Sequence, residues 1–154
     1  MKFIIIIAIL LLPSLHCIGQ FKVYSSTRNT NLSLYKKGIK VADGYDFICY
    51  EVWQKEEPKD GELESWRNEQ IKRRTQGGLT VAGFEKLAYE KTLYHIDCVR
   101  NKLRIEEVIK YAENGDVIFD FTNKNHKWSN VEPESVGAEL VNVVCNYVSE
   151  NKIQ

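Results

Sequence analysis

Residues 102–121 constrain the fold of this chain most strongly, because they have the pattern of a β-hairpin. Apolar and charged residues alternate from Lys102 to Ala112, as in an antiparallel strand with one buried side and one side in water. Asn114-Gly115 then signals a two-residue turn, and Val117, Phe119 and Phe121 alternate after it. The predicted buried side of 102–112 carries Leu103, Ile105, Ile109 and Tyr111, and the predicted water side carries Lys102, Arg104, Glu106 and Lys110.

Further strands are expected before this hairpin. Phe21 with Val23, and then residues 31–36, indicate two short opening strands. The segment 45–54, YDFICYEVWQ, carries aromatic and β-branched residues on both sides, which is typical of a central strand. Residues 89–98 indicate one more strand.

Two helical segments complete the pattern. Residues 55–88 are charged, and we expect them to form a polar loop followed by a helix over 62–74, with too little apolar content for a core of their own. Near the carboxy terminus, Pro133 suits a first helical turn, and Ser135 is able to satisfy free N–H groups there. A broad apolar stripe follows at helical spacing, formed by Val136, Leu140, Val143, Val144 and Tyr147.

The predicted fold is therefore α+β. It is an antiparallel β-sheet of about six strands, with a C-terminal α-helix packed on it and a short helical excursion in the middle. Residues 20–154 are expected to form a single domain, with 55–88 as a charged loop and helix insertion.

Residues 1–19 have the layout of a signal peptide. Lys2 precedes an apolar run from Phe3 to Leu12, and Pro13 follows it. The run is shorter than the roughly 20 residues of a membrane-spanning helix. We expect cleavage between Gly19 and Gln20, an exported mature chain that does not span the membrane, and a location in the periplasm, at the cell surface or in the medium. The alternative is a lipoprotein anchored through Cys17.

The charge balance argues against nucleic acid as a partner. Lysine and arginine together number 21, and so do aspartate and glutamate, so the formal net charge at pH 7 is zero. A chain without a net charge has no overall field that draws it to nucleic acid or to an anionic membrane.

The segment YHIDC, residues 94–98, places a histidine, an aspartate and a cysteine close together. On a strand, however, Cys98 points to the side opposite His95 and Asp97, so the thiol and its base are not within reach of each other. Cysteines of an exported chain more often pair. A bridge between Cys98 and Cys145 would fasten the terminal helix to the sheet, and Cys49 is expected to be a buried, unpaired thiol. We therefore predict no catalytic residue at this segment.

Other chemistry is weakly supported. His95 and Asp97 supply at most two metal ligands, and nothing fixes His126 near Cys98. The chain has no nucleophile elbow, glycine-rich phosphate loop or zinc-protease motif, so neither a metal nor a cofactor is expected. Trp53, Trp66 and Trp128 would suit a sugar-binding surface, although packing is the commoner role of such residues.

Three ordered segments resemble the bacterial surface-adhesin protein E-like domain family. They are LYHIDCVRNKLRI (93–105), IKYAENGDVI (109–118) and WSNVEPESVGAELVNVVC (128–145). The matching positions are Asp97, Cys98, Arg104, Trp128, Pro133, Ser135, Gly137, Val144 and Cys145. The resemblance implies an antiparallel sheet with a terminal helix, a Cys98–Cys145 bridge, and an envelope or surface location, with adhesion to host proteins in some members. Segment 55–88 is longer and more charged than the family pattern leads us to expect, and Cys49 has no role in that pattern.

From these observations we expect a non-enzymatic, exported binding domain whose partner is a protein of the envelope or the extracellular matrix. Exposed sheet edges would allow a homodimer through strand pairing. Two alternatives stay open: a structural or inhibitor subunit in the periplasm, and a small secreted hydrolase that uses His95, Asp97 or His126.

Overall fold

The computed structural model describes residues 21–154. The predicted signal peptide, its cleavage position and Cys17 lie outside the described residues. Within residues 21–154, no helix is both long enough and apolar enough to cross a membrane.

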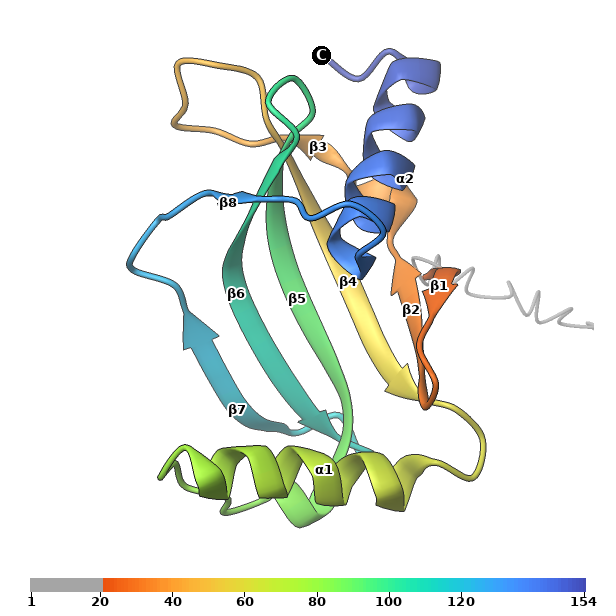
Figure 1. Ribbon diagram of the computed structural model, residues 1–154, viewed down its shortest axis with the longest axis vertical. Helices are drawn as coiled ribbons and strands as arrows, with labels where there is room; N and C mark the ends of the chain where they lie inside the picture. The colour runs from red at the N-terminus through yellow and green to blue at the C-terminus, as the bar shows by residue number, and fades with distance from the viewer. Residues whose placement is uncertain (1–20) are drawn as a thin grey trace, which may run out of the picture.

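The fold is α+β, as the sequence predicted, and is built on one antiparallel sheet (Figure 1). The order along the sheet is β1-β2-β4-β5-β6-β7, while β3 pairs with β4 and β8 with β6. The strands are β1 Lys22–Ser26, β2 Thr30–Leu34, β3 Lys40–Val41, β4 Tyr50–Pro58, β5 Leu87–Asp97, β6 Lys102–Ala112, β7 Val117–Thr122 and β8 Ser129–Asn130. The helices are α1 Leu63–Gln76, α2 Val136–Asn151, and two short 3₁₀ turns, η1 Lys36–Gly38 and η2 Phe84–Lys86.

The predicted hairpin is formed by β6 and β7. Gly115 adopts the left-handed conformation (φ 88°) that a glycine accepts without a steric penalty. The side-chain oxygen of Asn114 accepts a hydrogen bond from the Asp116 backbone N–H at 3.1 Å, which closes the turn. Asn114-Gly115 therefore marked the position of the hairpin correctly, but the predicted two-residue turn was wrong. Residues 113–116 connect the strands, and the Ala112 backbone N–H donates to the Asp116 oxygen at 2.9 Å.

Helix α2 begins one residue after Ser135, whose Oγ accepts a hydrogen bond from the Ala138 backbone N–H at 3.1 Å. Ser135 is thus the N-cap, as expected. Pro133 lies before the helix and not in its first turn, which corrects the prediction. The reason is Glu134, whose φ of 59° is left-handed and interrupts the helical geometry between the two residues.

The predicted central strand, 45–54, begins too early. Residues 45–49 form no strand, and β4 instead continues through Lys55, Glu56 and Glu57 to Pro58, which were expected in a polar loop. These residues pair with β2 on one side and, up to Glu56, with β5 on the other. Pairing on both sides holds a charged segment in an extended conformation although its composition favours a loop.

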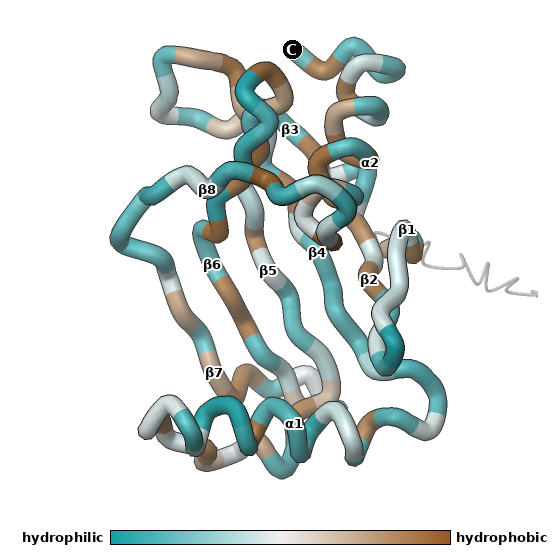
Figure 2. The backbone as a smooth tube through the Cα atoms, viewed as in Figure 1, coloured by the Kyte–Doolittle hydropathy of each residue, from teal (hydrophilic) through white to brown (hydrophobic). Residues whose placement is uncertain are grey.

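The two helices cover the same face of the sheet, which we call the helix face. Helix α2 packs its buried Leu140 and Val144 against Val52 and Ile96, and Figure 1 shows it crossing the upper part of the sheet. Helix α1 crosses the lower end (Figure 1). It is mostly hydrophilic (Figure 2) and contributes Trp66 to a second, smaller core. The opposite side, which neither helix covers, is the open face.

The alternation predicted for β6 fails because a β-bulge interrupts its pairing with β5. Two adjacent β5 residues pair with Ile105 and Glu107, which leaves Glu106 as an extra residue. One extra residue transfers the side chains that follow it to the other face. Ile105 therefore lies on the helix face, while Ile109 and Tyr111 lie on the open face. The prediction that these apolar residues share one buried side was wrong.

The predicted water side of β6 was also wrong, because Arg104 and Lys110 are buried, with 8% and 7% of their surfaces exposed. Each has an acidic partner: Arg104 forms an ion pair with Glu106, and Lys110 with Glu90. Lys110 also donates to Gln70 of α1 at 3.2 Å. Buried charges are tolerated where such partners replace water, and these partners come from the tertiary structure.

Candidate functional site

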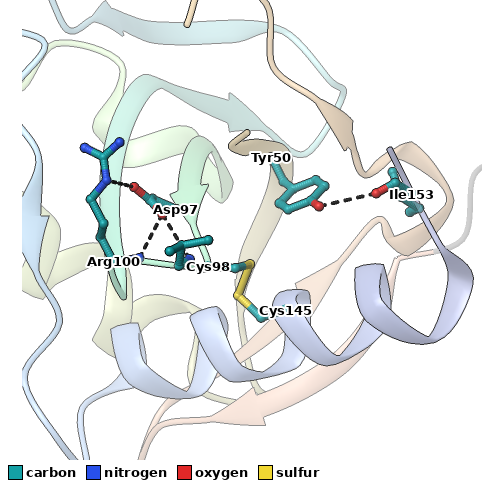
Figure 3. Close-up of a disulfide and its surroundings, with 7 residues drawn as sticks. Tyr50, Asp97, Cys98, Arg100, Cys145 and Ile153 are labelled. Atoms are coloured by element: carbon teal, nitrogen blue, oxygen red, sulfur yellow. Dashed lines mark hydrogen bonds and ion pairs between the residues drawn. A yellow bond between two sulfur atoms is a disulfide. The ribbon is translucent and has the colours of Figure 1, made fainter. Parts of the chain in front are cut away.

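The structure joins Cys98, just beyond β5, to Cys145 of α2 in a disulfide with a Cα–Cα distance of 5.6 Å (Figure 3). The bridge lies on the helix face, and it removes the Cys98 thiol that a catalytic reading of YHIDC requires. Cys49, the other cysteine of the described residues, is free and fully buried, as expected. Burial, with a smaller contribution from Asp97, raises the pKa of Cys49 to about 11, so its thiol stays protonated at neutral pH.

Asp97 has a structural role. Its carboxylate accepts hydrogen bonds from the backbone N–H groups of Val99 at 3.0 Å and Arg100 at 2.9 Å, and it forms an ion pair with the Arg100 Nε at 3.0 Å (Figure 3). These contacts close the turn between β5 and β6. With its acceptor sites occupied in this way, Asp97 does not orient His95.

His95 lies at the centre of a polar cluster on the open face. Its Nδ1 is 2.7 Å from the Tyr45 hydroxyl and 3.4 Å from a Glu106 oxygen, and its Nε2 is 3.9 Å from a Glu51 oxygen. The Arg104 guanidinium donates to the Tyr45 hydroxyl oxygen, which leaves the hydroxyl hydrogen free to donate to Nδ1 of His95. Burial lowers the pKa of His95, and the Glu106 carboxylate offsets part of that effect. A neutral ring with its proton on Nε2 fits this arrangement.

The β7–β8 connection reaches the same cluster. His126 approaches Glu106 at 3.9 Å, and its backbone oxygen accepts a hydrogen bond from Arg104 at 3.2 Å. The Trp128 ring lies 5.4 Å from the Arg104 guanidinium and 6.0 Å from the Tyr45 ring. The cluster thus ties two loops to the sheet through Arg104.

The structure therefore brings His95 and His126 to one carboxylate, Glu106, and leaves Asp97 and Cys98 in separate structural roles. Sequence reasoning missed Tyr45, Glu51 and Glu106, because the bulge at Glu106 and the loop that carries Tyr45 have no local signal. Within the described part of the chain, no three metal-binding side chains are grouped to hold an ion.

An aromatic groove of about 330 Å³ lies on the open face. Its volume is near the lower end of the range for ligand pockets. Its lining consists of Phe21, Tyr35, Trp53, Lys91, Ile109 and Tyr111, and we call it the Lys91 groove. The aromatic lining continues along the strands, since Tyr89 and Tyr111 stack with their ring centroids 4.8 Å apart.

The groove residues share the open face because of strand register. Lys91 pairs with Lys55 of β4 and with Ile109 of β6, and Trp53 pairs with Leu93. Cross-strand partners project from the same side of a sheet. The lining residues are all partly exposed, so this face presents aromatic and aliphatic surface to water where an antiparallel sheet usually presents polar residues.

The three tryptophans do not form one surface. Trp53 lines the Lys91 groove, Trp66 is buried beneath α1, and Trp128 packs on Arg104. Of the possible sugar-binding set, only Trp53 lies in this groove. The strand predicted over 89–98 was the sequence signal for Tyr89, Lys91 and Leu93, but a strand pattern does not say which face the helices leave open.

A larger cavity, of about 610 Å³, lies between α1 and the β6–β7 hairpin. Its main cation, Arg67, is already engaged: it donates to the Leu87 backbone oxygen at 3.0 Å and lies 3.5 Å from both Glu64 and Glu113. The other cation of this cavity, Lys86, is exposed to water. The Lys91 groove differs in having an aromatic lining around a partly buried cation without such partners, and it is therefore the better candidate for binding.

The comparison with protein families agrees with the resemblance seen in the sequence. The model of the family described as surface-adhesin protein E matches residues 52–146. That span contains most of the sheet, the disulfide, and every residue of the Lys91 groove except Phe21 and Tyr35. No curated protein and no solved structure matches the chain significantly. Because the match extends over more than half of its length, this chain belongs to the surface-adhesin protein E family.

Proposed function

We propose that this protein is a non-enzymatic binding domain that acts outside the cytoplasm and attaches to a protein partner through its open face. The observation that carries the proposal is the placement of both helices on one side of the sheet. The opposite side of the sheet therefore keeps an aromatic surface in partial contact with water. A partner that covered this surface would gain the favourable free energy of burying it. The family, named for a surface adhesin, is consistent with this role.

Export is part of the proposal. The disulfide suits an oxidising compartment, where such bonds persist, and residues 1–19 have the composition of a cleaved signal peptide. Mass spectrometry of the exported chain should give Gln20 as its first residue. A diacylated Cys17 would replace the free domain by a membrane-anchored one.

The His95 cluster supports a structural and not a catalytic role. Its groups satisfy one another: Arg104 bonds with Glu106, Tyr45 and the His126 backbone, and Tyr45 bonds with His95. Catalysis requires a group aimed at a substrate, whereas these contacts hold two loops against the sheet. Ester or amide hydrolysis that depends on His95 would contradict this assignment.

The test compares capture of envelope and matrix proteins by the immobilised mature domain and by a Trp53→Ala/Ile109→Ala variant. We expect the variant to lose at least about tenfold in affinity for the captured partner, which corresponds to about 1.4 kcal/mol. Leu79→Ala is the matched control, because Leu79 is exposed in the loop after α1, away from the groove. Circular dichroism must show that all three proteins fold alike.

The outcomes separate the candidate roles. Matrix proteins captured through the open face support adhesion, whereas an envelope protein captured through it supports the periplasmic subunit. Equal capture by the wild type and the groove variant would refute the open face as the binding surface. Light scattering at high concentration tests the proposed homodimer through an edge strand such as β7; a monomer throughout would remove that proposal.

A further inference from the structure

Two lysines, Lys55 and Lys91, stand directly opposite each other on the open face. Like charges in this position repel and destabilise a sheet. Lys55 forms an ion pair with Glu57. Lys91, in contrast, makes no hydrogen bond or ion pair with any described residue, so one cation of the pair is uncompensated.

The surroundings of Lys91 are aromatic. Its Nζ lies 5.2 Å from the centroid of the Tyr111 ring, 5.6 Å from that of Phe21 and 5.9 Å from that of Tyr89. The faces of aromatic rings attract an ammonium group and so offset part of its lost hydration, but they are poor acceptors for its hydrogen bonds. Burial lowers the pKa of Lys91, and repulsion from Lys55 lowers it further.

We propose that Lys91 binds a carboxylate of an acidic protein segment whose neighbouring apolar side chain occupies the Lys91 groove. The anion supplies the missing partner of the ammonium group, and the apolar side chain covers Trp53, Ile109 and Tyr111. A groove of about 330 Å³ accommodates one large side chain. The inference rests on the proposed function and specifies the chemistry of the partner.

The arrangement has a physical signature. A charged residue that destabilises the free protein and has no acidic or hydrogen-bonding partner within it is typical of a functional position. Lys91→Met keeps the aliphatic stem and removes the repelling charge, so the variant should unfold at a higher urea concentration than the wild type. A lower midpoint would mean that Lys91 supports the fold.

Binding is tested with two pentapeptides that differ only in charge, acetyl-GEFEG-amide and acetyl-GQFQG-amide. Each is titrated into the isotope-labelled mature domain while the Trp53 indole N–H and the Lys91 side chain are followed by NMR. We expect the acidic peptide to shift both signals and to bind at least about tenfold more tightly than the neutral one. The preference should weaken as salt is added.

Two variants assign the effect. Lys91→Met should remove the preference for the acidic peptide, and Lys72→Met should keep it, because Lys72 is an exposed lysine on α1 at the other face. Equal binding of the two peptides, no shift with either, or an unchanged preference in Lys91→Met would overturn the proposal. A response to N-acetylneuraminic acid alone would also overturn it, in favour of an acidic sugar.

These results are distinguishable from failure of the proposed function. If Trp53→Ala/Ile109→Ala abolishes capture of the natural partner and Lys91→Met does not, the open face binds that partner without a carboxylate at Lys91. If neither variant changes capture, the open face itself is not the binding surface.

Discussion

Removal of the Cys98–Cys145 disulfide should cost a large part of the stability of this domain. The two cysteines are 47 positions apart. In the chain-entropy model, a cross-link that closes a loop of this size lowers the entropy of the unfolded chain by an amount worth about 4 kcal/mol at 25 °C. Single domains typically have free energies of unfolding of about 5–15 kcal/mol. The bridge therefore decides whether α2 stays docked under mild denaturing conditions.

The assay is urea unfolding of the mature domain, oxidised and reduced, followed by tryptophan fluorescence. With a slope of about 2 kcal/mol per molar urea, a loss of 4 kcal/mol lowers the midpoint by about 2 M. The reduced wild type keeps both sulfur atoms and so isolates the cross-link. The Cys98→Ala/Cys145→Ala variant loses in addition the packing of two partly buried side chains against the main core.

Cys49→Ala is the control for the third thiol. Because Cys49 is free and buried, its replacement should leave the difference between the oxidised and reduced midpoints unchanged. Thiol titration of the unfolded, unreduced wild type should count one sulfhydryl among residues 21–154. A difference between oxidised and reduced protein below about 1 kcal/mol would refute the reasoning, because the loop-closure entropy would then not govern stability.

Two further changes probe local features. The pKa of His95 in the folded state lies below its ordinary value of 6.5. Near pH 6.5 the unfolded chain therefore binds more protons at this residue than the folded protein does, and the free energy of unfolding decreases as the pH falls. His95→Gln should therefore lose less stability than the wild type between about pH 7.5 and 5.5. Burial raises the pKa of Glu56, so this carboxyl group stabilises the fold as the pH falls. Because Glu56 is present in both proteins, its contribution cancels in the comparison. Ser135→Ala should lower the free energy of unfolding by about 1 kcal/mol through loss of the N-cap of α2, and Ser135→Gly by only a few tenths. Equal pH profiles in the first case, or equal losses in the second, would contradict these assignments.

Local patterns were sufficient for several elements. The β6–β7 hairpin follows from alternation and from Asn114-Gly115, and α2 follows from its apolar spacing and from the Ser135 cap. These signals involve residues close together in the chain, so no knowledge of the fold is needed to interpret them. The Cys98–Cys145 bridge could be predicted as well, because the two cysteines lie on elements that have to pack together.

Other features depend on partners that lie far apart in the chain. The charged residues Lys55 to Glu57 belong to β4 because β2 pairs with them on one side, with β5 also pairing up to Glu56. The cluster at His95 collects Tyr45 from one loop and Trp128 from the vicinity of another. Neither pattern has a local signature, since each is stabilised by contacts that exist only after the strands have assembled.

Patterns within the amino-acid sequence were sufficient to predict the kinds of element, the hairpin, the terminal helix and the covalent link that fastens it. The face of the sheet on which each side chain lies follows only from the tertiary structure. A strand repeats every two residues, so the single extra residue Glu106 inverts the alternation and places Ile109 and Tyr111 on the open face while Ile105 stays on the helix face. The docking of both helices on one face then leaves Lys91 and its aromatic neighbours partly exposed on the other. No short stretch of chain determines this docking, because it depends on the packing of whole surfaces.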